Sequence, residues 1–218
     1  MSNVFIVGAT GGVGKRLSPM LVASGHKVTG LCRDQKHADW YAQNQVERVD
    51  GDIAKMSVAE LTEALEGHDT VVFSAGASGA GKEVTDAVDG DGPLKLIEAM
   101  KQQGIDRFYL VSAIPEAGRT KGLGDGFEHY MQVKKNTDAA VVQSDVDWVI
   151  LRPGTLQDEE GDGAVSLAKA LPYGPVKRGN VAKVLSTLID TPEVKREIVE
   201  LTDGDIPVDE AVNTLAKG

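Results

Sequence analysis

The segment that decides the fold is Val4-Phe5-Ile6-Val7-Gly8-Ala9-Thr10-Gly11-Gly12-Val13-Gly14-Lys15, near the start of the chain. Its apolar run predicts a buried strand, its glycines at 8, 11 and 14 predict a tight turn, and a helix is expected directly afterwards. The spacing is G-x-x-G-x-x-G, not the commoner G-x-G-x-x-G, but the same physical roles apply. One glycine permits the turn, the next lets the backbone approach a pyrophosphate, and the third lets helix and strand pack closely.

The position of this turn, between the first expected strand and the first expected helix, is where a dinucleotide site requires it. The free amides at the start of the helix would meet the negative charge of the pyrophosphate. The alternative interpretation is a tight turn that binds no ligand. We expect a dinucleotide site here.

Short apolar runs alternate with longer amphipathic runs along the rest of the chain. The expected strands cover residues 4–7, 28–31, 46–49, 71–74, 108–111, 148–151 and 198–201. The expected helices cover residues 13–23, 34–42, 57–65, 93–103, 127–143, 181–189 and 208–216. Most of the strand candidates are near-continuous apolar runs, which is typical of strands buried on both faces. The alternation predicts an α/β doubly wound Rossmann fold, with a mostly parallel sheet of about seven strands and helices on both faces.

The region from 158 to 180 breaks this alternation. It begins with Asp158-Glu159-Glu160-Gly161-Asp162-Gly163 and ends near a Pro172-Tyr173-Gly174-Pro175 turn. We expect residues 155–180 to form a loop and short hairpin over the carboxyl ends of the strands, as a small substrate-side extension in the C-terminal part. The length of 218 residues predicts one domain over residues 1–218.

Charge and composition narrow the classes of function. The chain has 23 Lys and Arg against 33 Asp and Glu, a net charge of −10. So acidic a surface repels phosphate backbones, and neither nucleic acid nor a membrane is an expected partner. No segment has the roughly 18 uninterrupted apolar residues of a transmembrane helix, and the N-terminus lacks the basic region of a signal peptide. The single cysteine, Cys32, fits a reducing compartment, so we expect a cytoplasmic protein. The histidines show no metal-ligand spacing, so no metal site is expected.

Arg33 follows the second expected strand, where an acidic residue would bind the ribose 2′-hydroxyl of NAD. An arginine at this position suits the 2′-phosphate of NADP through a charge-assisted contact. The alternative is that Arg33 is a solvated surface charge and that Asp34 binds the ribose. The residue type favours NADP as the cofactor, with NAD less favoured.

Further motifs follow the glycine turn in a fixed order. They are Asp52-Ile53, Val88-Asp89-Gly90-Asp91-Gly92, Arg107-Phe108-Tyr109-Leu110-Val111-Ser112, Tyr130-Met131-Gln132-Val133-Lys134 and Leu151-Arg152-Pro153-Gly154. With these motifs the chain resembles the atypical, extended-like members of the short-chain dehydrogenase/reductase superfamily. Within that superfamily it is similar to the small NAD(P)-binding proteins described as epimerases or reductases. The resemblance covers nearly the whole chain.

The resemblance implies a set of cofactor-binding and catalytic residues. The implied cofactor-binding residues are Gly8, Thr10, Gly11, Gly12, Val13, Gly14, Arg33, Asp52, Ile53, Ala75, Gly76, Lys134 and Pro153. Asp52 and Ile53 would contact the adenine, and Pro153 would lie near the nicotinamide. The implied catalytic residues are Ser112, Tyr130 and Lys134, with Asp89 where extended members carry an asparagine.

Tyr130 and Lys134 are four residues apart on an expected helix, so they share a face. An ammonium beside the phenol would lower the tyrosine pKa toward working pH, which suits an acid/base catalyst. Ser112 could donate a hydrogen bond to a substrate carbonyl oxygen. The alternative is that Tyr130 is a half-buried packing residue and that the catalytic motif is vestigial.

The leading hypothesis is an NADP-dependent oxidoreductase that transfers hydride to or from a small carbonyl, quinone or similar acceptor. Its substrate pocket is expected between Ser112, Tyr130 and the 155–180 segment. The first alternative is a non-catalytic NADP-binding sensor that couples dinucleotide state to a protein partner. The second is a flavin- or tetrapyrrole-reductase-like enzyme that does not use the tyrosine. A monomer and a homodimer are both compatible with the sequence.

Overall fold

The computed structural model describes residues 1–115, 117–118 and 122–217. Within them the chain forms a nine-stranded sheet in the order β11-β8-β10-β6-β5-β4-β1-β2-β3. Its strands are β1 (Asn3–Val7), β2 (Lys27–Cys32), β3 (Glu47–Asp50), β4 (Thr70–Phe73), β5 (Arg107–Val111), β6 (Asp147–Pro153), β8 (Ala164–Ala168), β10 (Glu197–Asp203) and β11 (Ile206–Pro207). β1 to β6 and β10 all pair in parallel, so the expected doubly wound Rossmann fold is confirmed.

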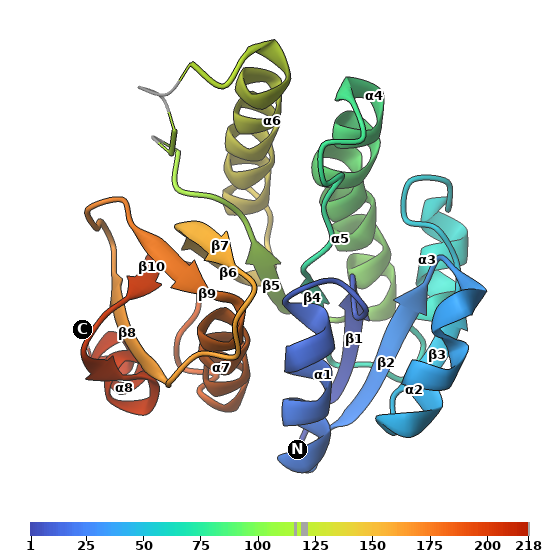
Figure 1. The fold of residues 1–218 in the computed structure, drawn as a ribbon. Coiled ribbons are helices and arrows are strands. Elements are labelled where there is room, and N and C mark those ends of the chain that lie inside the picture. The colour runs from blue at the N-terminus through green and yellow to red at the C-terminus, as the bar shows by residue number, and fades with distance from the viewer. Residues whose placement is uncertain (116, 119–121, 218) are drawn as a thin grey trace.

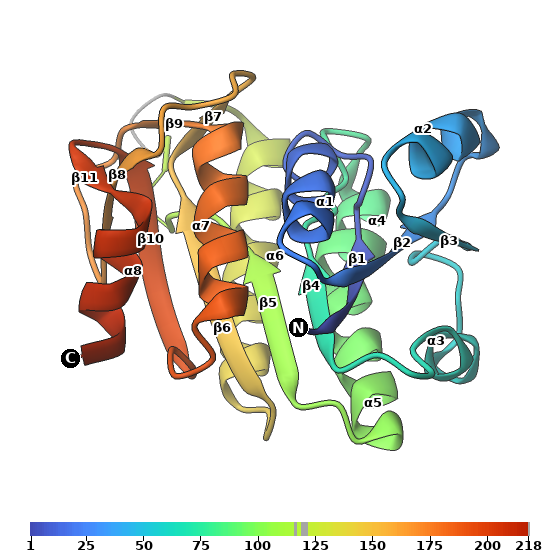
Figure 2. The same cartoon turned by 90° about the horizontal axis from the view of Figure 1, so that it is seen from below.

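Helices cover both faces of the sheet (Figures 1 and 2). They are α1 (Gly14–Ala23), α2 (Ala38–Gln43), α3 (Val58–Ala64), α4 (Lys82–Thr85), α5 (Gly92–Gln103), α6 (Asp125–Val142), α7 (Arg178–Asp190) and α8 (Val208–Lys217). α1, α7 and α8 lie on one face, where they share an apolar core with the sheet. α3, α5 and α6 cover the other face over a second apolar core. The near-continuous apolar strands are therefore buried on both sides, as their composition predicts.

The sheet has two more strands than the sequence predicts. β8 pairs antiparallel with β10, and β11 pairs antiparallel with β8 at the edge. The expected hairpin within 155–180 is wrong, because β7 (Thr155–Gln157) and β9 (Pro175–Lys177) pair in parallel as a separate two-stranded sheet. Between these two short strands the chain crosses to the main sheet as β8, and a connection of that kind allows parallel rather than antiparallel pairing.

The helix expected at 93–103 is preceded by further helical structure. α4 leads into a π-helix (Asp86–Asp91), labelled η2, and this leads without a break into α5. Pro93 has no N–H, so it cannot donate to the Asp89 carbonyl four residues earlier. The Thr137 hydroxyl on α6 donates to that carbonyl instead, at 2.9 Å. The π turn therefore has a cause in the sequence, and it carries Asp89 into the interior.

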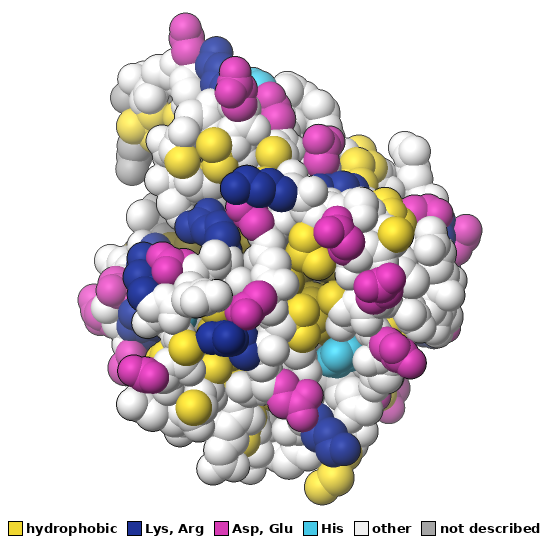
Figure 3. Space-filling model, turned by 90° about the vertical axis from the view of Figure 1, so that its right-hand side faces the viewer, with side chains coloured by type: hydrophobic (Ala, Val, Ile, Leu, Met, Phe, Trp, Pro, Cys, Tyr) yellow, Lys and Arg dark blue, Asp and Glu magenta, His cyan; other side chains and the backbone are white. Residues whose placement is uncertain are grey.

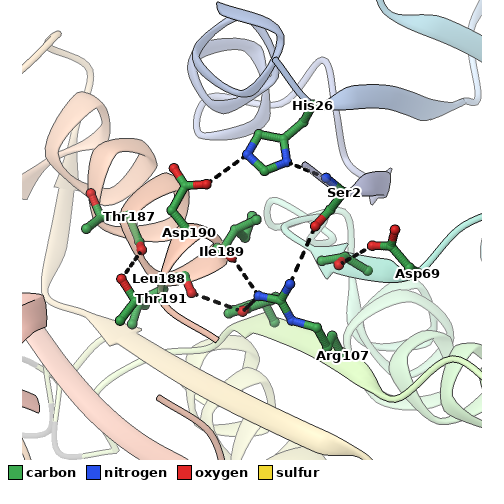
Figure 4. Close-up of polar contacts among 11 residues, drawn as sticks. Ser2, His26, Asp69, Arg107, Thr187, Leu188, Ile189, Asp190 and Thr191 are labelled. Carbon is green, nitrogen blue, oxygen red and sulfur yellow. Dashed lines mark hydrogen bonds and ion pairs between the residues drawn. The ribbon is translucent and has the colours of Figure 1, made fainter. Parts of the chain in front are cut away.

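A polar network fixes the ends of elements at the amino edge of the sheet (Figure 4). The Arg107 guanidinium donates to the Ile189 carbonyl at 2.6 Å, and the Tyr109 hydroxyl donates to the Leu188 carbonyl at 3.1 Å. His26 joins the backbone N–H of Ser2 to the Asp190 carboxylate. The last carbonyls of a helix have no partner within the helix, and here β5 supplies the partners. α7 is thus anchored at its C-terminal end, while its first residue lies at the opposite edge.

Candidate active site

A cavity of about 820 Å³ lies at the carboxyl ends of β1, β2, β4 and β5. This is the edge where an open α/β sheet binds its ligands, at the point where the strand order reverses. Fourteen of the residues expected at a site line this one cavity. They are Gly8, Thr10, Gly11, Gly12, Val13, Arg33, Asp52, Ile53, Ala75, Gly76, Asp89, Ser112, Tyr130 and Lys134. Gly14 and Pro153 are absent from its lining.

The glycine turn brings the ends of β1 and β4 into close contact. Gly8 has φ +94°, and a Cβ at this position would lie 2.6 Å from the Ala75 amide nitrogen. A Cβ on Gly14 would overlap the Gly8 carbonyl oxygen. Gly14 therefore lets α1 pack against the turn, which explains why it does not line the cavity. Position 8 requires a glycine for two reasons: its φ is in the left-handed region, and the backbone of Ala75 leaves no room for a Cβ.

Asp34, which follows Arg33 at the end of β2, is already engaged. Its carboxylate accepts from the Lys36 N–H at 3.0 Å and lies 2.8 Å from the Lys36 ammonium. These hydrogen bonds hold the Asp34 pKa below its usual value. Arg33 is exposed and lines the cavity, together with Lys36 and His37. The sequence reasoning missed the last two, although the run Arg33 to His37 contains three basic side chains.

Lys134 and Asp89 form a buried pair in the lining of the cavity that also contains Tyr130. The Lys134 ammonium donates to the Val111 carbonyl at 3.0 Å and lies 3.5 Å from the Asp89 carboxylate. The second Asp89 oxygen accepts from the Ala77 N–H at 2.9 Å. Both side chains are almost completely buried. The positive charge of Lys134 is thus balanced by Asp89.

The pKa of Tyr130 shifts in the direction opposite to the one that the sequence predicts. Burial raises its pKa strongly, and the Asp89 and Asp138 carboxylates raise it further. The prediction that Lys134 lowers this pKa is wrong, because burial raises it and Asp89, which pairs with the ammonium, adds its own negative charge near the phenol. The raised pKa keeps the Tyr130 phenol protonated at neutral pH.

Ser112 lies at the end of β5 with its hydroxyl buried. Its Oγ makes no hydrogen bond of good geometry in the part of the chain that the structure describes, although the Asp138 carboxylate lies beside it. A buried hydroxyl that is held so loosely is uncommon and is available to a bound molecule. It lines the same cavity as Tyr130, so one substrate oxygen could meet both groups.

Asp138 and Arg152 form an ion pair that the sequence reasoning missed. Arg152 donates to the Asp138 carboxylate at 2.8 Å, and Asp138 is buried. Burial raises the pKa of Asp138, while the Ser112 hydroxyl beside it and the Arg152 guanidinium oppose the shift. Asp138 is one helical turn beyond Lys134, so the spacing could have revealed that the two share a face.

The rest of the structure adds two findings. Among residues 1–115, 117–118 and 122–217, no group of three His, Cys, Asp or Glu side chains could hold a metal ion. In the same part of the chain, no helix has the length and apolarity to cross a membrane. Figure 3 shows acidic and basic side chains interspersed on the face it presents.

Comparisons with known proteins give consistent results. A family model described as NAD(P)H-binding matches residues 8–192. Over 215 residues the chain is 33% identical to a protein of Bacillus subtilis named as an uncharacterized sugar epimerase, YhfK, covering 98% of this chain and all of that protein. A solved structure described as an NAD-dependent epimerase/dehydratase of Bacillus halodurans has a TM-score of 0.89 at 27% identity, covering 98% and 100% of the two chains. The oxidoreductase ylbE of Lactococcus lactis has a TM-score of 0.86 at 26% identity, covering 99% and 97%.

Proposed function

Because the chain belongs to the NAD(P)H-binding family of atypical short-chain dehydrogenases/reductases, we propose that it is an NADP-dependent oxidoreductase. Its acceptor would be a small carbonyl, quinone or similar compound. The observation that carries the proposal is that a single cavity joins the glycine turn, Arg33 and the Ser112–Tyr130 pair. Nucleotide binding and acid chemistry would then take place in one continuous space.

The cavity fits a dinucleotide. Its volume of about 820 Å³ lies within the range of small-molecule sites. Gly8, Gly11 and Gly12 line the cavity, so backbone without side chains lies there beside the first amides of α1. Those amides favour an anion such as the diphosphate. Asp52 and Ile53 line the cavity beyond β3, where the adenine would lie.

In this proposal the reduced nicotinamide, when bound, supplies a hydride to the substrate carbon and becomes oxidised. The Ser112 hydroxyl donates a hydrogen bond to the substrate oxygen and orients it. Tyr130 transfers its phenolic proton to that oxygen, so the carbonyl leaves as an alcohol. The Lys134 ammonium and the Asp89 carboxylate lie in the lining of the site, and their opposite charges balance each other. The phenol is then reprotonated from water before the next turnover.

A tyrosine-independent reductase is the second candidate, because one observation favours it. Lys134 is bound to Val111 and Asp89 and does not lower the Tyr130 pKa. An enzyme of that kind would reduce acceptors such as flavins without taking a proton from the tyrosine. The activity of Tyr130→Phe separates the two candidates.

We expect Arg33→Ala to weaken NADPH binding by about 10- to 100-fold, which corresponds to the loss of one charge-assisted contact. NADH binding should change by less than about twofold, because NADH lacks the 2′-phosphate. Asp34 cannot replace the contact, because its carboxylate, which pairs with Lys36, would repel the 2′-phosphate. Fluorescence titration with both nucleotides measures the change.

The matched control is Arg48→Ala, which removes an arginine of β3 that lies outside the cavity lining. Its affinity for both nucleotides should equal that of the unmodified protein. Equal losses for NADPH and NADH in Arg33→Ala would contradict the assignment of Arg33 to the 2′-phosphate.

A further inference from the structure

Gly12 is a glycine whose backbone does not require one. Unlike Gly8, it has no left-handed φ, and it is not one of the three glycines of the G-x-x-G-x-x-G pattern. A Cβ at this position would lie 2.5 Å from Nε and 2.6 Å from Cδ of Arg178. What glycine provides here is therefore room for the arginine side chain. Arg178 lies directly on the turn and lines the cavity.

Two arginines lie at this turn, and their surroundings differ. Arg16 is fully engaged: it donates to the Gly12 carbonyl at 2.7 Å and pairs with Asp158 at 3.1 Å and Glu160 at 2.9 Å. Arg178 has a longer contact, 3.9 Å to the same Asp158, whose side chain is 66% exposed. A pair this long and this exposed contributes little. Arg16 therefore has a structural role, whereas the Arg178 guanidinium is free to bind an anion more strongly than it binds Asp158.

The backbone of Arg178 is held firmly. Gly179, the next residue, donates its N–H to the Glu159 carbonyl at 3.0 Å, and the Glu160 carbonyl occupies the place where its Cβ would be. At the far end of α7, Arg107 and Tyr109 bind the last carbonyls of the helix (Figure 4). α7 also packs against α1. A rigid helix therefore presents Arg178 to the glycine turn.

We propose that Arg178 binds the diphosphate of the dinucleotide at the glycine turn. This rests on the proposed function and extends it to a residue beyond the motifs of that family. Guanidinium groups form paired, charge-assisted hydrogen bonds with phosphate oxygens, and a diphosphate offers several of them. Arg178 exchanges the weak contact with Asp158 for this stronger one. The C-terminal part of the chain thereby contributes directly to cofactor affinity.

The proposal separates Arg178 from Arg33 by the part of the nucleotide that each would bind. Arg178→Ala should weaken NADPH and NADH binding by the same factor, about 10- to 100-fold, because both carry the diphosphate. Binding of adenosine 2′-monophosphate, which has no diphosphate, should be unchanged in Arg178→Ala and weakened in Arg33→Ala. Arg178→Lys should recover part of the lost affinity, since it keeps the charge without the planar fork.

Titration calorimetry with the whole protein measures these affinities, and Lys183→Ala is the matched control. Lys183 is a cation on the same helix that faces Asp209 and lies outside the cavity lining. Lys183→Ala should leave the affinities for NADPH, NADH and adenosine 2′-monophosphate unchanged. Gly12→Ala tests the packing: it should weaken NADPH binding in the native background and do so less in the Arg178→Ala background.

Failure of the role assigned to Arg178 can be distinguished from failure of the proposed function. If the unmodified protein binds NADPH and Arg178→Ala binds both dinucleotides within twofold of it, the role of Arg178 is overturned and the proposed function stands. If the unmodified protein binds neither dinucleotide, both proposals fail together. A loss confined to NADPH would place Arg178 at the 2′-phosphate and would also overturn this inference.

Discussion

Replacing Tyr130 with phenylalanine should lower kcat for carbonyl reduction by about 10²- to 10⁴-fold, the usual contribution of a positioned proton donor. The substitution removes only the hydroxyl, and the ring contact with Phe127 remains possible. NADPH affinity should stay within about twofold, because the phenol is assigned to the substrate oxygen. Stopped-flow or steady-state measurement of NADPH consumption with a reducible carbonyl gives kcat, and titration gives the affinity.

The pH profile gives this prediction a second readout. Burial and the Asp89 and Asp138 carboxylates raise the Tyr130 pKa above its usual value. A group with a raised pKa keeps its proton up to higher pH, so between pH 7 and about 10 no loss of reduction should come from ionisation of Tyr130. If Lys134 instead lowered this pKa, reduction would fall as the pH rises through neutrality.

Tyr41→Phe is the control for the Tyr130 variant. Tyr41 is also buried, donates its hydroxyl to the Leu31 carbonyl at 3.1 Å and lies outside the cavity lining. Loss of the Tyr41 hydroxyl should lower the free energy of unfolding by about 1 kcal/mol and leave kcat unchanged. Unimpaired reduction by Tyr130→Phe would exclude the proton-donor role and favour the tyrosine-independent reductase.

The second large effect is expected at Gly14. An alanine there places its Cβ on the Gly8 carbonyl oxygen and close to the backbone of Ala9, neither of which can rotate away. Forcing an atom into a closely packed junction costs about 1 to 3 kcal/mol or more, so we expect a loss of about 3 kcal/mol. For a chain of this length the melting temperature should fall by about 6 to 12 °C. Thermal unfolding followed by circular dichroism measures the shift.

Gly126→Ala is the matched control, since in the described part of the chain no atom outside its own helical turn lies within 4 Å of its Cβ position, and Gly126 is in the first turn of α6. This change should leave stability equal or raise it by up to about 1 kcal/mol, because alanine favours a helix. An unchanged melting temperature in Gly14→Ala would contradict the packing role of that glycine.

Much of the fold could be predicted because its signals are local. The strands β1, β4, β5 and β6 contain short apolar runs, and the glycine turn fixes where the first of them meets α1. The pairing of β7 with β9 could not be predicted in the same way. Three-residue strands such as Thr155–Gln157 are too short to show a period, and their partner is chosen by the path of the chain through β8.

In the site, too, the features encoded in local motifs could be predicted, and those that depend on tertiary packing could not. Residues within the motifs, such as Ser112 and Asp52, could be placed from the sequence. The sign of the Tyr130 pKa shift could not, because it depends first on the burial of the phenol and then on the Asp89 and Asp138 carboxylates, and both follow from the packing of the folded chain. Arg178 gave no signal at all, since only the packing of α7 against α1 brings it to Gly12.

The central claim is that the glycine turn and Arg33 form an NADP site, and titration of the unmodified protein with NADPH and NADH tests it most directly. Calorimetry should give an affinity for NADPH at least about 10-fold higher than for NADH, the value of one charge-assisted contact to the 2′-phosphate. Binding of neither nucleotide would contradict the account, because the turn would then serve only the packing of α1 on β1 and the role assigned to Tyr130 would fall with it.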